Sequence, residues 1–356
     1  MSGGITLKID RIDRNLAQTG PPSKYLCYYD VCNHPFVLYG VTKTQSTGFV
    51  RLPEEVAAQV SEGVQCLCHQ TAGGRVRFCT DSTEIALHAF LPELEYFPHM
   101  SLLGSSGFDL YVHGEYGFEY CKSFIPSYEN TTEILASIQF SHREMREIII
   151  HFPLYQAVDK LLIGLDQNSE ISTPSGYSIA CPIVFYGSSI TQGGCASRPG
   201  NAYQAIISRM LDCDFVNLGF SGNAKGEPSM AEYISGLDMT AFVYDYDCNA
   251  PDAQYLQKTH EPFFKIIRNK QPSLPVIMVS RPDFAADRKA NGVRRDIIRK
   301  TYENAPPTDN NVYFIDGEHL FDGNQPDSCT VDGCHPNDLG FMRMAKKIGS
   351  VLQHII

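Results

Sequence analysis

The 356-residue sequence contains no tryptophan and no apolar run of about 18 residues, the length that spans a membrane. Its beginning, Met1–Arg14, lacks the apolar stretch of a signal peptide. Basic residues are also few, because 29 Lys and Arg face 40 Asp and Glu, which gives a formal net charge of −11. Phosphate backbones and anionic lipids attract basic surfaces, so nucleic acid and membrane partners are disfavoured. We therefore expect a cytoplasmic protein.

The composition itself is that of a globular protein. Hydrophobic residues make up 43% of the chain and charged residues 19%, which excludes a disordered or fibrous chain. The 12 cysteines of such a leaderless chain are expected to be reduced thiols that pack as small hydrophobic residues. At about 150 residues per domain, the length predicts two domains.

Residues 1–176 consist of short alternating apolar runs broken by Gly, Pro and Ser. This pattern predicts an antiparallel β-sandwich, jelly-roll-like, with one helix near Glu54–Glu62 where Pro53 suits the first turn. The predicted strands are Gly48–Leu52, Arg75–Cys79, Glu84–Phe90, Gly107–Val112, Arg146–Phe152 and Lys160–Leu165.

A polar, Ser-rich stretch at 166–180 marks a boundary, and residues 177–356 form the second predicted domain. Its strands alternate with helices, which predicts an α/β fold with a parallel sheet covered by helices on both faces. Ligands of such sheets bind beyond the carboxyl ends of the strands. The predicted strands are Pro182–Tyr186, Asp214–Leu218, Met239–Tyr246, Leu274–Ser280 and Val312–Ile315, and the helices are Asn201–Leu211, Ala253–Asn269, Asp287–Asn304 and Asp338–Gln353.

Small and polar residues follow the first three of these strands and precede the last helix. They are Gly187–Ser189, Ser221–Asn223, Asn249, and the pair Asp332 and His335. Each alone is ordinary turn or capping chemistry. Together they bring a hydroxyl, hydrogen-bond donors and an Asp/His pair to one edge of the sheet.

This order of motifs resembles the SGNH (GDSL-type) hydrolases, which have a flavodoxin-like fold. The resemblance puts Ser189 in the nucleophile position and matches Asp332 and His335 to the last block of that family. Ser189, Gly222 and Asn249 match its oxyanion hole. Two departures stand out: Ser188 replaces the usual Asp, and the segment around Asn249 lacks the usual Gly and final Asp.

A subgroup of this family looks similar over most of the chain. It has G-S-S in place of G-D-S, a C-A-S-R-P-G stretch matched by Cys195–Gly200, and an N-terminal sandwich domain with a G-x-D-L-Y motif matched by Gly107–Tyr111. Such a domain packs beside the hydrolase and helps to shape the substrate cleft. His113–Tyr120 alternates as a strand does, which predicts one aromatic face packed against the hydrolase domain or the sandwich core.

The chemistry that the resemblance implies is ester hydrolysis through an acyl-enzyme on Ser189. His335 would take the serine proton, Asp332 would orient the imidazole, and the oxyanion would be held by the N–H groups of Ser189 and Gly222 and the amide of Asn249. No cofactor or metal is needed. The expected substrates are small acyl esters, such as acetyl esters, of a carbohydrate or another polar hydroxyl compound.

Other interpretations of the same residues stay open. An acyltransferase would use the same acyl-enzyme with a hydroxyl acceptor in place of water, and a non-catalytic binding protein could retain the fold. A metal site at Cys329, Asp332, Cys334 and His335 lacks the paired spacing of zinc sites. Cys195 is a rival nucleophile only if its thiol is activated. Arg198 and Arg281 follow strands and are either substrate contacts or loop anchors.

Overall fold

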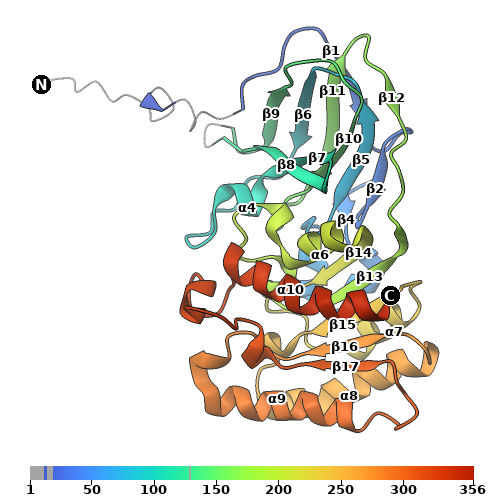
Figure 1. Cartoon of the computed structure of the whole chain (residues 1–356), viewed down its shortest axis with the longest axis vertical. Coiled ribbons are helices and arrows are strands. Elements are labelled where there is room, and N and C mark those ends of the chain that lie inside the picture. Colours follow the sequence, from blue (N-terminus) through green and yellow to red (C-terminus); the bar gives the residue numbers. More distant parts are fainter. Residues whose placement is uncertain (1–11, 14–18, 128–129) are drawn as a thin grey trace, which may run out of the picture.

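The structure, a computed structural model, describes residues 12–13, 19–127 and 130–356. Most of Met1–Arg14 and the start of the predicted sandwich domain therefore lie outside the described residues. A β-sandwich lies at one end of the molecule and an α/β layered half at the other (Figure 1). None of the helices in the described part of the chain has the length and apolar character that a membrane span needs.

The sandwich consists of two antiparallel sheets whose facing sides bury a common core. Alternate residues such as Phe78 and Leu87 point into this core, as the period of two in the sequence predicts. One sheet has the order β1 (Leu26–Asp30), β11 (Lys160–Asp166), β6 (Glu84–Phe90) and β9 (Glu133–Gln139). The other has the order β12 (Ile171–Ser172), β5 (Arg75–Thr80), β10 (Arg146–His151), β7 (Phe108–Gly114) and β8 (Gly117–Phe124), with β2 (Val37–Tyr39) also paired to β5.

The second half is a five-stranded parallel sheet, and the α/β prediction is confirmed. In chain order the strands lie 2-1-3-4-5, which is the flavodoxin-like arrangement. They are β14 (Cys213–Gly219), β13 (Ile179–Gly187), β15 (Ala241–Asp245), β16 (Val276–Val279) and β17 (Val312–Ile315).

Helices cover both faces of this sheet. Ile183 and Phe185 of β13 share a core with α6 (Tyr203–Leu211) and α10 (Asp338–Ile355). Val184 and Tyr186 share the opposite core with α7 (Pro228–Ser235), α8 (Ala253–Lys270) and α9 (Arg288–Glu303). Because both sides of β13 are buried, the strand is a continuous apolar run rather than an alternating one.

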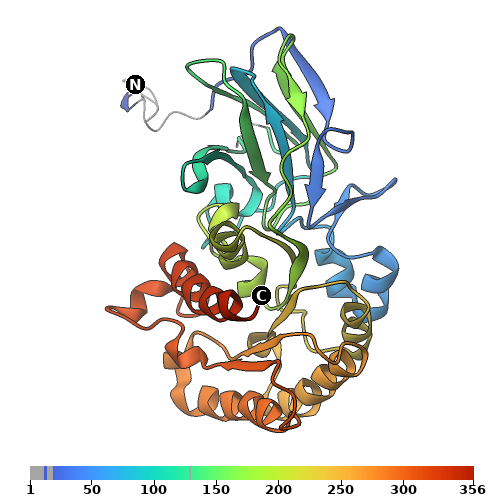
Figure 2. The ribbon, with the colours of Figure 1, turned by 45° about the vertical axis from the view of Figure 1, so that its right-hand side comes forward.

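Part of the N-terminal half completes the second core. The segment α2 (Glu54–Val60) and α3 (Glu62–Leu67) packs beside α7, and Ala57 and Val64 are buried with the α/β residues. Figure 2 shows these two blue helices against the α/β half. The predicted helix near Glu54–Glu62 is present and continues, after a break at Ser61, into α3.

Two arginines of the N-terminal half bind the outer side of β14, which is an edge strand. Arg51 donates to the carbonyl oxygens of Asn217 at 3.0 Å and Gly219 at 2.8 Å. Arg75 donates to the carbonyl of Phe215 at 3.1 Å and pairs with the carboxylate of Asp214. These guanidinium groups satisfy backbone acceptors that an exposed edge would leave free.

One local prediction was wrong. His113–Tyr120 is a hairpin rather than a single strand, because the chain turns between Gly114 and Gly117 from β7 into β8. Gly117 has a φ of +95°, which favours glycine at this turn. The turn leaves Tyr116 85% exposed, whereas Tyr120 packs against Tyr111 and the Arg198 guanidinium of the α/β half.

Candidate active site

The carboxyl ends of three adjacent strands carry the predicted site. β13 lies between β14 and β15, and its last residue, Gly187, is level with Gly219 on one side and Asp245 on the other. The loops that follow these strands therefore begin next to one another. The topology brings together the segments of Ser189, Gly222 and Asn249, which are far apart in the sequence.

A short helix, α5 (Ser189–Gln192), begins at the predicted nucleophile. Ser188 is its N-cap, and the Ser188 hydroxyl accepts a hydrogen bond from the Ile190 N–H at 3.2 Å. A Cβ on Gly187 would lie 2.3 Å from the Asp245 carbonyl oxygen, so only glycine allows this close approach before the turn. Ser188 is fully buried, whereas Ser189 is half-buried and faces the loops.

The structure brings the three predicted catalytic residues into one hydrogen-bonded row. The Ser189 Oγ lies 2.9 Å from Nε2 of His335. Nδ1 of the same imidazole lies 2.7 Å from Oδ2 of Asp332. With Nδ1 held by the carboxylate, Nε2 is the ring nitrogen that faces the serine.

The loop of Asp332 fixes its carboxylate as well as the imidazole. Oδ1 of Asp332 accepts hydrogen bonds from the backbone N–H groups of His335 at 2.7 Å and Cys334 at 3.0 Å. Burial by itself would raise the pKa of Asp332, but the hydrogen bonds from His335 and Cys334 lower it to about 2. The carboxylate is therefore charged at neutral pH. Val331 N–H donates to the His335 carbonyl at 2.9 Å and closes the loop.

The two other residues of the predicted oxyanion hole lie on the neighbouring loops. Gly222 is exposed and has a φ of +68°, a conformation that favours glycine. The side-chain amide of Asn249 donates to the carbonyl of Phe220 at 2.9 Å, which ties the loop after β15 to the loop after β14.

The G-x-D-L-Y motif of the sandwich holds the loop that follows α5. The buried carboxylate of Asp109 accepts from Nη1 of Arg198 at 2.9 Å and from the N–H of Gly200 at 3.0 Å, and the Tyr111 hydroxyl also contacts Arg198. Burial raises the pKa of Asp109, an effect that the Arg198 charge and the Gly200 N–H oppose. The same loop contacts the His335 loop, because Cys195 N–H donates to the Pro336 carbonyl at 3.0 Å.

The structure bears on three other interpretations of the sequence, which concern Cys195, Cys329 and Arg281. Burial, with a smaller effect from Asp332, raises the pKa of the Cys195 thiol to about 11, so this thiol is protonated near neutral pH and is not an activated nucleophile. For the metal site considered at Cys329, Asp332, Cys334 and His335, Cys329 is buried in the core, and its sulfur accepts a hydrogen bond from Nη1 of Arg343 at 3.2 Å. Arg281 binds both oxygens of the Asp283 carboxylate at 2.6 Å, so it anchors its own loop, as Arg198 does.

Two residues beside the site, Tyr155 and His99, could not be predicted from the sequence pattern. The hydroxyl of Tyr155, from the loop after β10, donates to the Ser189 carbonyl at 3.2 Å. The ring of His99, from the loop after β6, lies 5.8 Å from the His335 ring between centroids. Both belong to the N-terminal half, and neither is part of a motif or a period, so only the tertiary contacts reveal them.

The fold joins a flavodoxin-like α/β half to an accessory sandwich, with a row of Ser, His and Asp side chains beyond the strand ends. Residues 180–353 match the GDSL-like lipase/acylhydrolase family, and residues 26–171 match the N-terminal domain of SGNH-type esterases. The chain belongs to this family and is a carboxylic ester hydrolase. No curated protein sequence matches it.

Several solved structures are similar over nearly their whole length. A GDSL-like lipase from Bacteroides ovatus is 28% identical with a TM-score of 0.83, covering 93% of this chain and 98% of that one. The salicylyl-acyltransferase SsfX3 of a tetracycline biosynthetic pathway is 18% identical with a TM-score of 0.76, covering 94% and 99%. A family two carbohydrate esterase from Clostridium thermocellum is 14% identical with a TM-score of 0.61, covering 90% and 98%.

Proposed function

We propose that the protein hydrolyses small acyl esters, such as acetyl esters, of a carbohydrate or another polar hydroxyl compound. Ser189 attacks the ester carbonyl while His335 takes its proton, and Asp332 holds the imidazole in the required tautomer. The observation that carries this proposal is the row of 2.9 Å and 2.7 Å contacts from Ser189 through His335 to Asp332.

The oxyanion of the tetrahedral intermediate is stabilised by the N–H groups of Ser189 and Gly222 and by the amide of Asn249. Asn249 uses one amide hydrogen on Phe220, and the second is the one directed to the substrate. One such donor is worth about 3–4 kcal/mol of barrier. The alcohol then leaves with the proton from His335, and water releases the acyl group by the same steps in reverse.

Similar structures favour a polar alcohol. The chain is similar in fold to a family two carbohydrate esterase and to an acetyl xylan esterase from Butyrivibrio proteoclasticus.

The test is a panel of acetylated sugars and longer p-nitrophenyl acyl esters, assayed with the wild type and with Ser189→Ala. We expect hydrolysis of the acetyl esters by the wild type and none above background by the folded variant. Hydrolysis retained by Ser189→Ala would overturn the assignment of the nucleophile, and a preference for long acyl chains would overturn the substrate class.

Acyl transfer is the second candidate, because the chain is similar over 94% of its length to an acyltransferase. Both reactions share the acyl-enzyme and differ in whether water or a hydroxyl acceptor reaches it. Product analysis with an added sugar or glycerol acceptor separates them. A transferred acyl group that exceeds the free acid would identify a transferase.

A further inference from the structure

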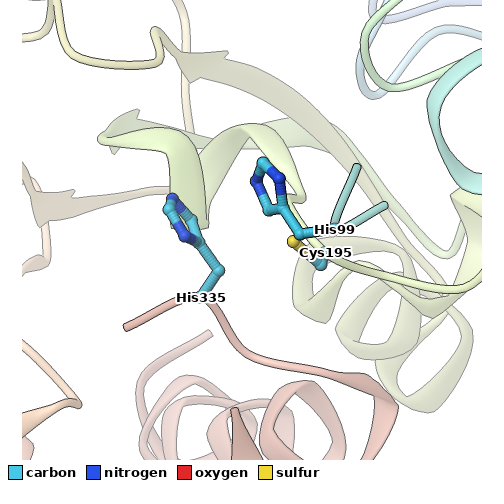
Figure 3. A group of neighbouring side chains, drawn as sticks. All are labelled: His99, Cys195 and His335. Carbon is cyan, nitrogen blue, oxygen red and sulfur yellow. The ribbon is translucent and has the colours of Figure 1, made fainter. Parts of the chain in front are cut away.

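One group of His, Cys, Asp and Glu side chains within the described residues offers three ligand atoms in reach of a single ion. It consists of His99, Cys195 and His335, each of which offers one ligand atom, and these three atoms lie within 4.8 Å of one another. Figure 3 shows the two imidazoles side by side with the sulfur of Cys195 at the foot of His99. The three residues come from different segments: the sandwich half, the loop after α5, and the loop before α10.

The loops of Cys195 and His335 are held in place by hydrogen bonds, whereas the imidazole of His99 can rotate. Cys195 is buried, and its backbone is tied to the His335 loop through the Pro336 carbonyl. His99 is exposed, but Phe97 and Met100 on either side of it pack against the core, and the Phe97 ring contacts Tyr155. The His99 loop is thus held at the site while its imidazole is free to rotate.

The geometry is close to that of a zinc site. Zn–N bonds of about 2.0–2.1 Å and Zn–S bonds of about 2.3 Å place tetrahedral ligand atoms roughly 3.3–3.6 Å apart. The present separations of up to 4.8 Å therefore need to shorten by about 1 Å. Rotation of the exposed His99 ring can shorten the two distances that involve His99, and a change of the Cys195 side-chain rotamer can shorten the third.

The position of Asp332 favours metal binding as well as catalysis. It holds Nδ1 of His335, which leaves Nε2 as the metal ligand. A carboxylate on the other ring nitrogen is the arrangement that zinc-bound histidines have in proteins. Two imidazoles and a thiolate also form a ligand set that suits Zn²⁺ among the common divalent ions.

We propose that His99, Cys195 and His335 form an inhibitory zinc site. Zn²⁺ binds Nε2 of His335, a ring nitrogen of His99 and the sulfur of Cys195, whose thiol proton is released to solvent. The metal then occupies the lone pair that would accept the Ser189 proton, so hydrolysis stops until zinc dissociates. Because zinc would regulate the same active site, this inhibition rests on the proposed function, which is ester hydrolysis at Ser189.

The kinetic test compares zinc inhibition of p-nitrophenyl acetate hydrolysis in the wild type, His99→Asn and Cys195→Ser, each relative to its own rate in EDTA. We expect both variants to need about 100-fold more zinc, since loss of an outer-shell partner alone costs 10–100-fold in affinity. The matched controls are His142→Asn and Cys181→Ser, which remove exposed residues elsewhere and keep wild-type inhibition.

A binding test does not depend on hydrolysis. Co²⁺ bound to a thiolate gives a near-ultraviolet charge-transfer band, which we expect in the wild type and in the inactive Ser189→Ala variant, and not in Cys195→Ser. A wild type without this band, or equal zinc inhibition of His99→Asn and the wild type, would overturn the site. If no ester is hydrolysed while the cobalt band is present, the proposed function fails and the metal site stands.

Discussion

Ser188 occupies the position where the family usually has Asp, and its contacts explain why the exchange is tolerated. The hydroxyl caps α5 by accepting from the Ile190 N–H, which is a role that Ser and Asp share. The cap fixes the first turn of the helix and with it the backbone of Ser189. The departure from the family motif therefore leaves the serine where the hydrogen bond to His335 requires it.

The single substitution Asp332→Asn tests whether the Asp332 carboxylate orients the His335 imidazole. The variant keeps the shape of the loop but favours the wrong imidazole tautomer, so we expect kcat to fall by about 10⁴ with little change in KM. Steady-state kinetics with p-nitrophenyl acetate measure both. Asp338→Asn is the control, because Asp338 binds Ser197 and Asn201 instead. A similar kcat in Asp332→Asn and the wild type would assign the orienting role to another group.

At the scale of elements, the loop Cys195–Gly200 connects three parts of the protein. It follows α5, its Arg198 pairs with Asp109 of β7, and its Cys195 N–H donates to the loop of His335. The sandwich motif thus holds the loop that follows α5, through the contacts of Asp109 with Arg198 and Gly200. Through the pair of Arg198 and Asp109, the sandwich domain supports a loop of the candidate active site.

Arg198→Met tests this connection, because it leaves the carboxylate of Asp109 buried without its cation. We expect the free energy of unfolding to fall by about 3–5 kcal/mol. In Asp109→Asn/Arg198→Met the loss should be smaller than the sum of the two single variants. Urea unfolding at neutral pH gives the four values of the cycle. Strictly additive losses would show that the pair is not coupled.

The packing of α8 on β15 carries a pH dependence. His260 is buried against the Tyr244 ring, with Nδ1 2.9 Å from the Thr301 hydroxyl, and burial lowers its pKa to about 3. Below about pH 6.5 the unfolded chain binds a proton at this position that the folded chain does not. Stability therefore falls as pH falls, by about 2 kcal/mol between neutral pH and pH 5.

The variant His260→Asn removes this proton uptake, so its urea midpoint should change less than that of the wild type between pH 7 and about pH 5. Its stability at pH 7 will be lower because the smaller side chain leaves space beside Tyr244. The exposed His142→Asn serves as the control with wild-type pH dependence. An unchanged pH dependence in His260→Asn would mean that other groups control acid unfolding.

At the scale of the whole molecule, the two halves share their interior. The α2–α3 segment fills one core of the α/β half, and Arg51 and Arg75 bind the carbonyl groups along the edge strand β14. A sandwich that merely stood beside the hydrolase would leave that edge open. The physical unit of folding therefore extends across the boundary predicted near residue 176.

A fragment of residues 177–356 tests this conclusion. It exposes the apolar surface under α2–α3 and the unpaired edge of β14, so we expect it to aggregate or to lack a cooperative thermal transition. The full chain should unfold in a single calorimetric transition. Circular dichroism and calorimetry make the comparison. A stable, monomeric and active fragment would show that the halves fold independently.

Much of the fold and of the site follows from local sequence. The bounds predicted for β6 and β17 are those of the structure, because short alternating or fully apolar runs bounded by polar residues identify strands. The roles expected for Ser189, Asp332 and His335 come from the resemblance to the SGNH hydrolases, and the structure places the three side chains in one hydrogen-bonded row. The hairpin between Gly114 and Gly117 was missed, because its alternation continues through the turn.

The sequence by itself indicated the fold class through its local periodicity, and it indicated the class of protein through a resemblance that rests on short motifs, each readable from a few neighbouring residues. Only the tertiary structure decided what surrounds the serine. Tyr155 and His99 reach it from the sandwich half, and Asp109 holds the loop beside it. These contacts join residues about 30 to 240 positions apart, where no local period acts and only the packing of the two halves brings side chains together.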